Sequence, residues 1–135
     1  MIAIPERTRT RANGLAVVGT ALHAILGLAL FAGYVYYVPA AKKVFDEFGL
    51  KLPLVASNVI WLSDWVVEHQ RLLVVVIGGC VVADFVVIWA IGRRGLFSLP
   101  VLWVLSVALL IVGTGAITTY AIESAMRQLR EGLAR

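Results

Sequence analysis

The sequence has few charged residues, and this shortage excludes an ordinary soluble domain. Asp, Glu, Lys and Arg make up 15% of the 135 residues, hydrophobic residues make up 61%, and the mean hydropathy is +0.91. A soluble fold of this length cannot bury so large a share of apolar side chains in its core. The composition therefore predicts a membrane protein in contact with the lipid bilayer.

The sequence has one cysteine, Cys80, which excludes an internal disulfide. Cys80 lies within a long apolar run, and we interpret it as a small packing or lipid-facing residue. The long apolar runs contain one histidine, His23, and one aspartate, Asp84, without the spacing of metal ligands. The sequence shows no nucleophile motif, P-loop or glycine-rich phosphate turn. We therefore expect no metal, no cofactor and no enzyme activity.

Three long apolar runs predict three transmembrane helices. Each run reaches the roughly 20 residues that a helix needs to cross about 30 Å of hydrocarbon. The runs cover residues 15–38, 72–91 and 99–122. A polar N-terminus, 1–14, precedes the first run, with Thr10 or Asn13 as the expected N-cap, and a short turn, 92–98, joins the last two runs. We expect an all-α membrane protein whose residues, 1–135, form a single membrane domain.

The segment 39–71, between the first two runs, mixes charged residues with aromatic residues at helical spacing. One helix is predicted to end at Gly49, a common C-capping residue, and a second is predicted to begin near Pro53. Tryptophan side chains suit the headgroup layer, where the ring is buried and the indole N–H stays hydrated. We therefore expect an amphipathic helix-turn-helix on the membrane surface. Its expected contacts with the interface or with a partner are Phe45, Phe48, Trp61 and Trp65.

The C-terminal segment, 123–135, continues the helical pattern of the third run. Apolar residues keep one face of this segment, and charged residues take the other. The pattern predicts an amphipathic helical extension that leaves the bilayer. Two interpretations stay open for it: an interfacial helix without a partner, or a helix that docks on a partner protein.

Small residues within the runs predict close contacts between helices. In the first run they are Ala16, Thr20, Ala24, Ala29 and Gly33, and in the second they are Gly79 and Ala83. Whether such contacts join helices of one chain or of two subunits stays open, so a homo-oligomer is one expectation.

The net charge of +4 comes from basic residues that are scattered over the chain, with no aromatic-interleaved patch of the kind that binds nucleic acid. We interpret these residues as membrane-flanking charges. Their number on the two sides of the predicted helices does not favour a cytoplasmic N-terminus, but their density does. The dense groups are Arg7, Arg9 and Arg11 before the first run, and Arg93 with Arg94 in the turn.

His23 and Asp84 are the ionisable residues within the runs. His23 lies eight residues from the start of the first run and Asp84 seven from the end of the second. In antiparallel neighbours they would lie at nearly equal depth, about 10 to 12 Å from the same surface. A carboxylate at that depth is costly and usually has a partner. Three interpretations stay open: a hydrogen-bonded pair that locks two helices, a proton relay or ligand site, and chance proximity.

The segment after the first run resembles a known family. Val38-Pro39, Phe45 to Gly49, Leu52-Pro53-Leu54 and Leu62-Ser63 follow the order and the spacing of a loop in the inner-membrane platform proteins of type II secretion and type IV pilus assembly (the PilC/GspF family). The resemblance covers about residues 38–66. It implies a bacterial inner membrane protein with a cytoplasmic N-terminus and an outward loop and C-terminus. The cytoplasmic helical domains of that family, which are held to contact the assembly ATPase, have no counterpart here, so the resemblance implies the membrane skeleton and not the motor function.

The leading functional hypothesis is a non-catalytic scaffold or accessory subunit of a larger membrane assembly, with other membrane protein subunits as partners. One alternative is a platform-like component of a type II secretion or type IV pilus-like system. The other is a small proton-linked transporter or sensor that works through His23 and Asp84.

Overall fold

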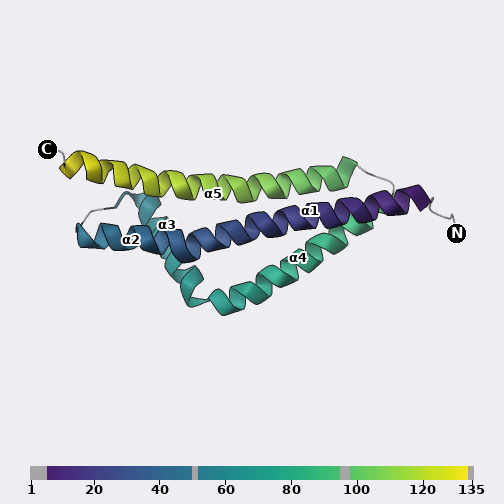
Figure 1. Cartoon of the computed structure of the whole chain (residues 1–135), viewed down its shortest axis with the longest axis horizontal. Coiled ribbons are helices and arrows are strands. Elements are labelled where there is room, and N and C mark those ends of the chain that lie inside the picture. The colour runs from purple at the N-terminus through teal and green to yellow at the C-terminus, as the bar shows by residue number, and fades with distance from the viewer. Residues whose placement is uncertain (1–5, 50–51, 95–97, 134–135) are drawn as a thin grey trace. The chain divides into compact units, whose positions relative to one another are not determined.

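The computed structural model describes residues 6–49, 52–94 and 98–133, and every regular element in these ranges is a helix (Figure 1). Side chains are described for residues 10–49, 52–94 and 98–132. The elements are α1 (Glu6–Ala32), the π-helix η1 (Gly33–Tyr37), α2 (Val38–Glu47), α3 (Leu54–Glu68), α4 (Gln70–Gly92) and α5 (Ser98–Leu133).

Three of these helical stretches are long and apolar enough to span a membrane. They are Thr10–Glu47, Gln70–Gly92 and Ser98–Gly132. The predicted fold class, an all-α membrane protein with three transmembrane helices, is confirmed by this arrangement of elements. The predicted helical continuation beyond residue 122 is also present, because α5 continues without a break to Leu133.

The ends of the helices differ from the predicted ends in two places. Helix α1 begins at Glu6, so Thr10 and Asn13 lie inside the helix and the expectation of an N-cap there was wrong. The loop helix α2 also follows directly from the first span through η1, without an intervening turn. The turn between α2 and α3 is where the sequence places it, since Gly49 has a φ of 59°. That conformation suits glycine, which has no Cβ to clash with the backbone.

The chain divides into two compact units, each formed by segments that are distant in sequence. Unit 1 comprises the described residues within Met1–Leu28 and Val74–Ile111, from α1, α4 and α5. A Cβ added at Gly19 would lie 2.7 Å from Val104 of α5 and 3.2 Å from Ile88 of α4. The absence of a side chain at Gly19 therefore allows the three helices to approach one another.

One face of α1 is buried in unit 1. The buried residues recur every three or four positions, as expected for one helix face, and include Ala12, Ala16, Thr20 and His23. Of the small residues predicted to make helix contacts, Ala16 and Thr20 are buried, whereas Gly79 and Ala83 are exposed on α4. Gly79 and Ala83 are therefore not part of the buried interior of the chain, because α4 buries the opposite side, around Ile88 and Gly92.

Unit 2 comprises the described residues within Ala29–Leu73 and Val112–Arg135. Its apolar core brings together η1, α2, α3 and the C-terminal part of α5. The core includes Tyr34, Val38, Phe45, Ala56, Val59, Ile60, Ile122 and Ala125. Lys42 of α2 and Asp64 of α3 form an ion pair at 2.7 Å on the outer side of this unit.

The π-helix η1 lies just before Pro39, a residue that interrupts the backbone hydrogen bonds of a helix. In η1 the N–H of Val38 donates to the carbonyl of Gly33, five residues earlier. The next bond of that kind would join residue 39 to the carbonyl of Tyr34, but Pro39 has no N–H to donate. The hydroxyl of Ser63, on α3, donates to this carbonyl instead. A buried carbonyl that the helix cannot satisfy is thus satisfied by a neighbouring helix.

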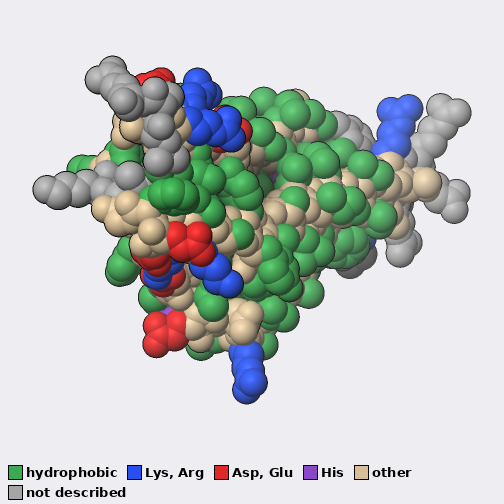
Figure 2. Space-filling view, turned by 60° about the vertical axis from the view of Figure 1, so that its left-hand side comes forward, with side chains coloured by type: hydrophobic (Ala, Val, Ile, Leu, Met, Phe, Trp, Pro, Cys, Tyr) green, Lys and Arg blue, Asp and Glu red, His purple; other side chains and the backbone are tan. Residues whose placement is uncertain are grey.

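Most outward-facing side chains of the long helices are apolar, as expected when the surrounding solvent is lipid. In α4, for example, Val75 is 75% exposed and Val82 is 64% exposed, while only Ile88 and Gly92 of this helix are buried. Figure 2 shows hydrophobic side chains over much of the visible surface, with most of the acidic side chains lying beside basic ones.

Candidate functional site

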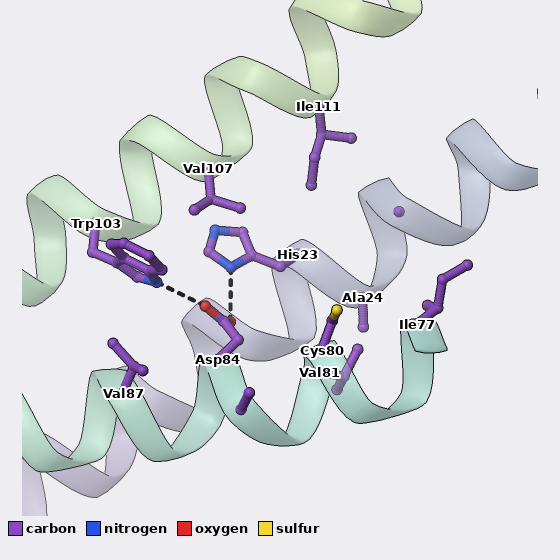
Figure 3. A pocket seen from close by; sticks show the side chains of 12 residues that line it. His23, Ala24, Ile77, Cys80, Val81, Asp84, Val87, Trp103, Val107 and Ile111 are labelled. Atoms are coloured by element: carbon purple, nitrogen blue, oxygen red, sulfur yellow. Dashed lines mark hydrogen bonds and ion pairs between the residues drawn. The ribbon is translucent and has the colours of Figure 1, made fainter. Parts of the chain in front are cut away.

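The strongest candidate site is a cluster of polar side chains in unit 1, within the membrane-spanning helices (Figure 3). Nδ1 of His23 lies 2.8 Å from Oδ2 of Asp84, and Nε2 of His23 lies 2.9 Å from the backbone carbonyl oxygen of Val104. The indole N–H of Trp103 donates to Oδ1 of Asp84 at 2.8 Å. The contact between His23 and Asp84 that their equal depth predicted is therefore present.

The cluster connects each pair of helices in unit 1 by one hydrogen bond. His23 of α1 contacts Asp84 of α4 and the carbonyl of Val104 of α5, and Trp103 of α5 contacts Asp84. The His23 side chain is 6% exposed and the Asp84 side chain 13% exposed. A polar contact between membrane helices contributes about 1 kcal/mol. Three such contacts are a substantial share of the stability of a small domain.

The partners of each atom define where the protons of the cluster lie. A carbonyl oxygen only accepts, so Nε2 of His23 carries the proton that it donates to Val104. An indole N–H only donates, so Oδ1 of Asp84 is an acceptor. The short contact between Nδ1 and Oδ2 then requires one further proton between these two atoms. The pair is neutral overall wherever that proton resides, which avoids a net charge within the membrane.

Both ends of the cluster finish at groups that do not exchange protons. On one side the chain of hydrogen bonds ends at a backbone carbonyl, and on the other side it ends at an indole N–H. A proton relay needs a group at each end that can take up or release a proton at accessible pH. Within the described residues, the hydrogen bonds of the pair therefore link three helices and lead to no third titratable side chain.

A second polar contact joins α1 and α4. The indole N–H of Trp89 donates to Oδ1 of Asn13 at 3.0 Å, and the guanidinium of Arg93 lies 4.6 Å from the centroid of the Trp89 ring. Asn13 therefore acts as a side-chain acceptor between helices and not as a helix cap. The contact places an amphipathic Trp and a basic residue together at one end of α4, an arrangement typical of a membrane interface.

The four aromatic residues that were expected to make outside contacts differ in their exposure. Trp61 is 68% exposed, Phe48 50% and Trp65 41%, so these three are available to lipid or to a partner. Phe45 is 1% exposed and belongs to the core of unit 2. The expectation of a partner contact at Phe45 is corrected here, because the buried face of α2 turns this ring toward α3 and α5.

The sequence did not indicate two members of the cluster, Trp103 and the carbonyl of Val104. A tryptophan in an apolar run is usually a lipid-facing residue, and the carbonyl of a helix interior is usually bonded only within its own helix. A second hydrogen-bond donor to Asp84 could have been expected, because a buried carboxylate has two oxygens and His23 contacts only one of them. Trp103 supplies this donor.

The described residues place no group of three or more His, Cys, Asp or Glu side chains around a common point where a metal ion could bind. Comparisons of the chain with protein-family models, with curated proteins and with solved structures find no match.

Proposed function

We propose that this protein is a non-catalytic scaffold or accessory subunit of a larger membrane protein assembly. The observation that carries the proposal is the closed cluster of His23, Asp84 and Trp103, which links three helices pairwise and uses both nitrogens of the imidazole and both oxygens of the carboxylate. Such a cluster holds helices in a defined arrangement, because each nitrogen and each oxygen of the pair has a partner on another helix. A rigid arrangement of helices is what a scaffold supplies.

The surface proposed to contact other subunits is the outer face of α3. Trp61 and Trp65 lie four residues apart on this helix and are both exposed, while the opposite face of α3 packs in the core of unit 2. Tryptophan is enriched at the centres of protein interfaces. We further propose a bacterial inner membrane location with a cytoplasmic N-terminus. The density of arginines near the first span and the family resemblance support this orientation.

A proton-linked transporter or sensor is the weaker alternative, because the hydrogen bonds of the His23–Asp84 pair end at a carbonyl and an indole. A platform-like component of a secretion or pilus system rests on the resemblance of residues 38–66. Pro39 and Ser63 both belong to the motifs that carry this resemblance. Pro39 has no N–H for the carbonyl of Tyr34, and Ser63 donates to that carbonyl. Part of the resemblance can therefore be explained by the local structure alone, without a shared function.

The scaffold proposal is tested by the size of the particle that the protein forms. In mild detergent and in nanodiscs made from native membranes, the chain is expected in a complex larger than its 14.6 kDa monomer. Replacing Trp61 and Trp65 by Ala should reduce the complex to smaller particles, whereas Tyr120→Ala, at an exposed aromatic of α5, should leave it intact. A monomer under all these conditions would contradict the scaffold proposal.

A further inference from the structure

A pocket of about 390 Å³ lies beside the polar cluster in unit 1, between α1, α4 and α5 (Figure 3). The volume is within the range of about 300 to 1,000 Å³ that is typical of small-molecule sites. The pocket is partly open to its surroundings. Figure 3 shows His23, Asp84 and Trp103 grouped on one side of it, with Ile77 and Ile111 on the other.

Small residues create the space. Gly27 of α1 lines the pocket, and a Cβ added there would meet no atom within 4 Å. Ala24 on the same helix and Ala83 on α4 also contribute short side chains to the wall. Larger side chains at these positions would occupy the pocket, so the recess is a property of these residues and can be removed by substitution.

The wall offers almost nothing to a polar ligand. Its remaining side chains are mostly aliphatic, and they include Val81, Val87 and Val107. The two nitrogens of His23 and the two oxygens of Asp84 are already bonded within the protein. A bound water needs two to four polar partners, and the almost wholly apolar wall exposes few, so an apolar occupant is favoured over water.

The surroundings of the pocket identify the source of that occupant. All twelve lining residues lie in the helical stretches that are long and apolar enough to span a membrane. Three of the lining residues, Cys80, Ala83 and Trp103, are themselves exposed at the surface of these helices. The open side of the pocket therefore faces hydrocarbon. A helix with its side chains is about 10 Å across, so a single turn of about 5.4 Å occupies roughly 420 Å³, more than the whole pocket, whereas a single acyl chain is much thinner.

We propose that this pocket binds one acyl chain of a bilayer lipid, which lies against the His23–Asp84–Trp103 cluster as an integral part of the unit. The acyl chain would fill space beside the cluster in which the lining side chains otherwise have no packing partners. Unfilled space of this kind reduces the stability of a protein. The proposal depends on the membrane location of the helices and not on the scaffold function. Either one can therefore fail while the other stands.

The test is native mass spectrometry of the full chain, released from detergent after repeated washing to remove loosely bound lipid. The wild-type protein is expected to retain one diacyl lipid, identified by fragmentation. Gly27→Leu fills the recess from α1 and should abolish this retention. Ala83→Leu should do the same from α4, at a position that lines the pocket and is exposed.

The matched control is Gly78→Leu. Gly78 is an exposed glycine of α4 that has open space around it and does not line the pocket, so this variant should retain the lipid as the wild type does. Circular dichroism and gel filtration would confirm that each variant is folded. The proposal is overturned if the washed wild type retains no lipid, if folded Ala83→Leu retains it fully, or if the retained mass is an isoprenoid or a second protein chain.

Discussion

At the scale of single residues, the cluster in unit 1 is defined by which atoms can donate and which can accept. His23 and Asp84 share one proton, and their outer atoms are held by Val104 and Trp103. The cost of placing a carboxyl group in a span is offset because both of its oxygens are bonded and the pair has no net charge. The residues of the cluster thus explain how an aspartate is accommodated among apolar helices.

Trp103→Phe tests the contribution of the indole N–H. The ring is largely kept, but Oδ1 of Asp84 loses its donor, so we expect a loss of about 1 kcal/mol in the free energy of unfolding. The measurement is an unfolding titration in detergent micelles followed by circular dichroism. Trp61→Phe is the control, because Trp61 is 68% exposed and outside the cluster. Equal stability of both variants and the wild type would show that the indole bond contributes nothing.

The contact between His23 and Asp84 could be predicted because depth in a helix follows from counting residues, at about 1.5 Å for each residue. The participation of Trp103 and Val104 could not be predicted in this way. It depends on the rotation of α5 about its own axis, and the near-uniform apolar sequence of that run contains no periodic signal to define this rotation. The exposure of Gly79 and Ala83 on α4 could not be predicted for the same reason.

At the scale of elements, the continuation of α1 through η1 into α2 depends on how one backbone carbonyl, that of Tyr34, is hydrogen-bonded. Pro39 removes the N–H that would bond to the carbonyl of Tyr34, and Ser63 of α3 supplies the missing donor. The hydroxyl of Tyr34 also donates to Oγ1 of Thr118 at 2.8 Å, since the proton of Thr118 goes to the carbonyl of Thr114. Tyr34 therefore connects η1 with both α3 and α5.

Ser63→Ala should destabilise the protein by about 1 to 3 kcal/mol, because it leaves a buried carbonyl without a donor. Pro39→Ala restores an N–H at residue 39, which can bond within the helix. The double variant should therefore lose less stability than the sum of the two single changes, and a double-mutant cycle of unfolding free energies measures this coupling. Ser57→Ala is the control, since Ser57 donates only within its own helix. Strict additivity would contradict the proposed role of Ser63.

Much of the element structure followed from sequence pattern. The turn at Gly49, the start of α3 after Pro53 and the ends of α4 were close to their predicted places because Gly, Pro and charged residues mark them. The π-helix was not predicted, since its cause lies in the pairing of Pro39 with Ser63, 24 residues later. The burial of Phe45 was missed because an amphipathic helix has the same pattern whether its apolar face meets lipid or protein.

At the scale of the whole molecule, the apolar outer faces of the long helices require a bilayer, and the orientation in it determines which surfaces partners can reach. In a Cys80→Ala background, a cysteine introduced at Glu47 should react with a membrane-impermeant thiol reagent added outside cells. One introduced at Arg94 should react only after the membrane is permeabilised. The reverse pattern would contradict the proposed cytoplasmic N-terminus.

The central claim is that the His23–Asp84 pair locks helices and does not relay protons, and Asp84→Asn tests it most directly. An asparagine can donate its N–H to Nδ1 of His23 and accept from Trp103 through its oxygen, so every bond of the cluster can be kept without a titratable carboxyl. Asp84→Leu, of similar size, loses two of the three bonds and is the matched comparison.

The decisive measurement is the free energy of unfolding of these two variants in the same micelles, together with the size of the complex that each forms. The structural account predicts that Asp84→Asn stays within about 0.5 kcal/mol of the wild type, and that Asp84→Leu loses about 1 to 3 kcal/mol and part of its assembly. An Asp84→Asn variant as unstable as Asp84→Leu, or one that folds and assembles normally but loses a proton-linked activity of the wild type, would contradict it.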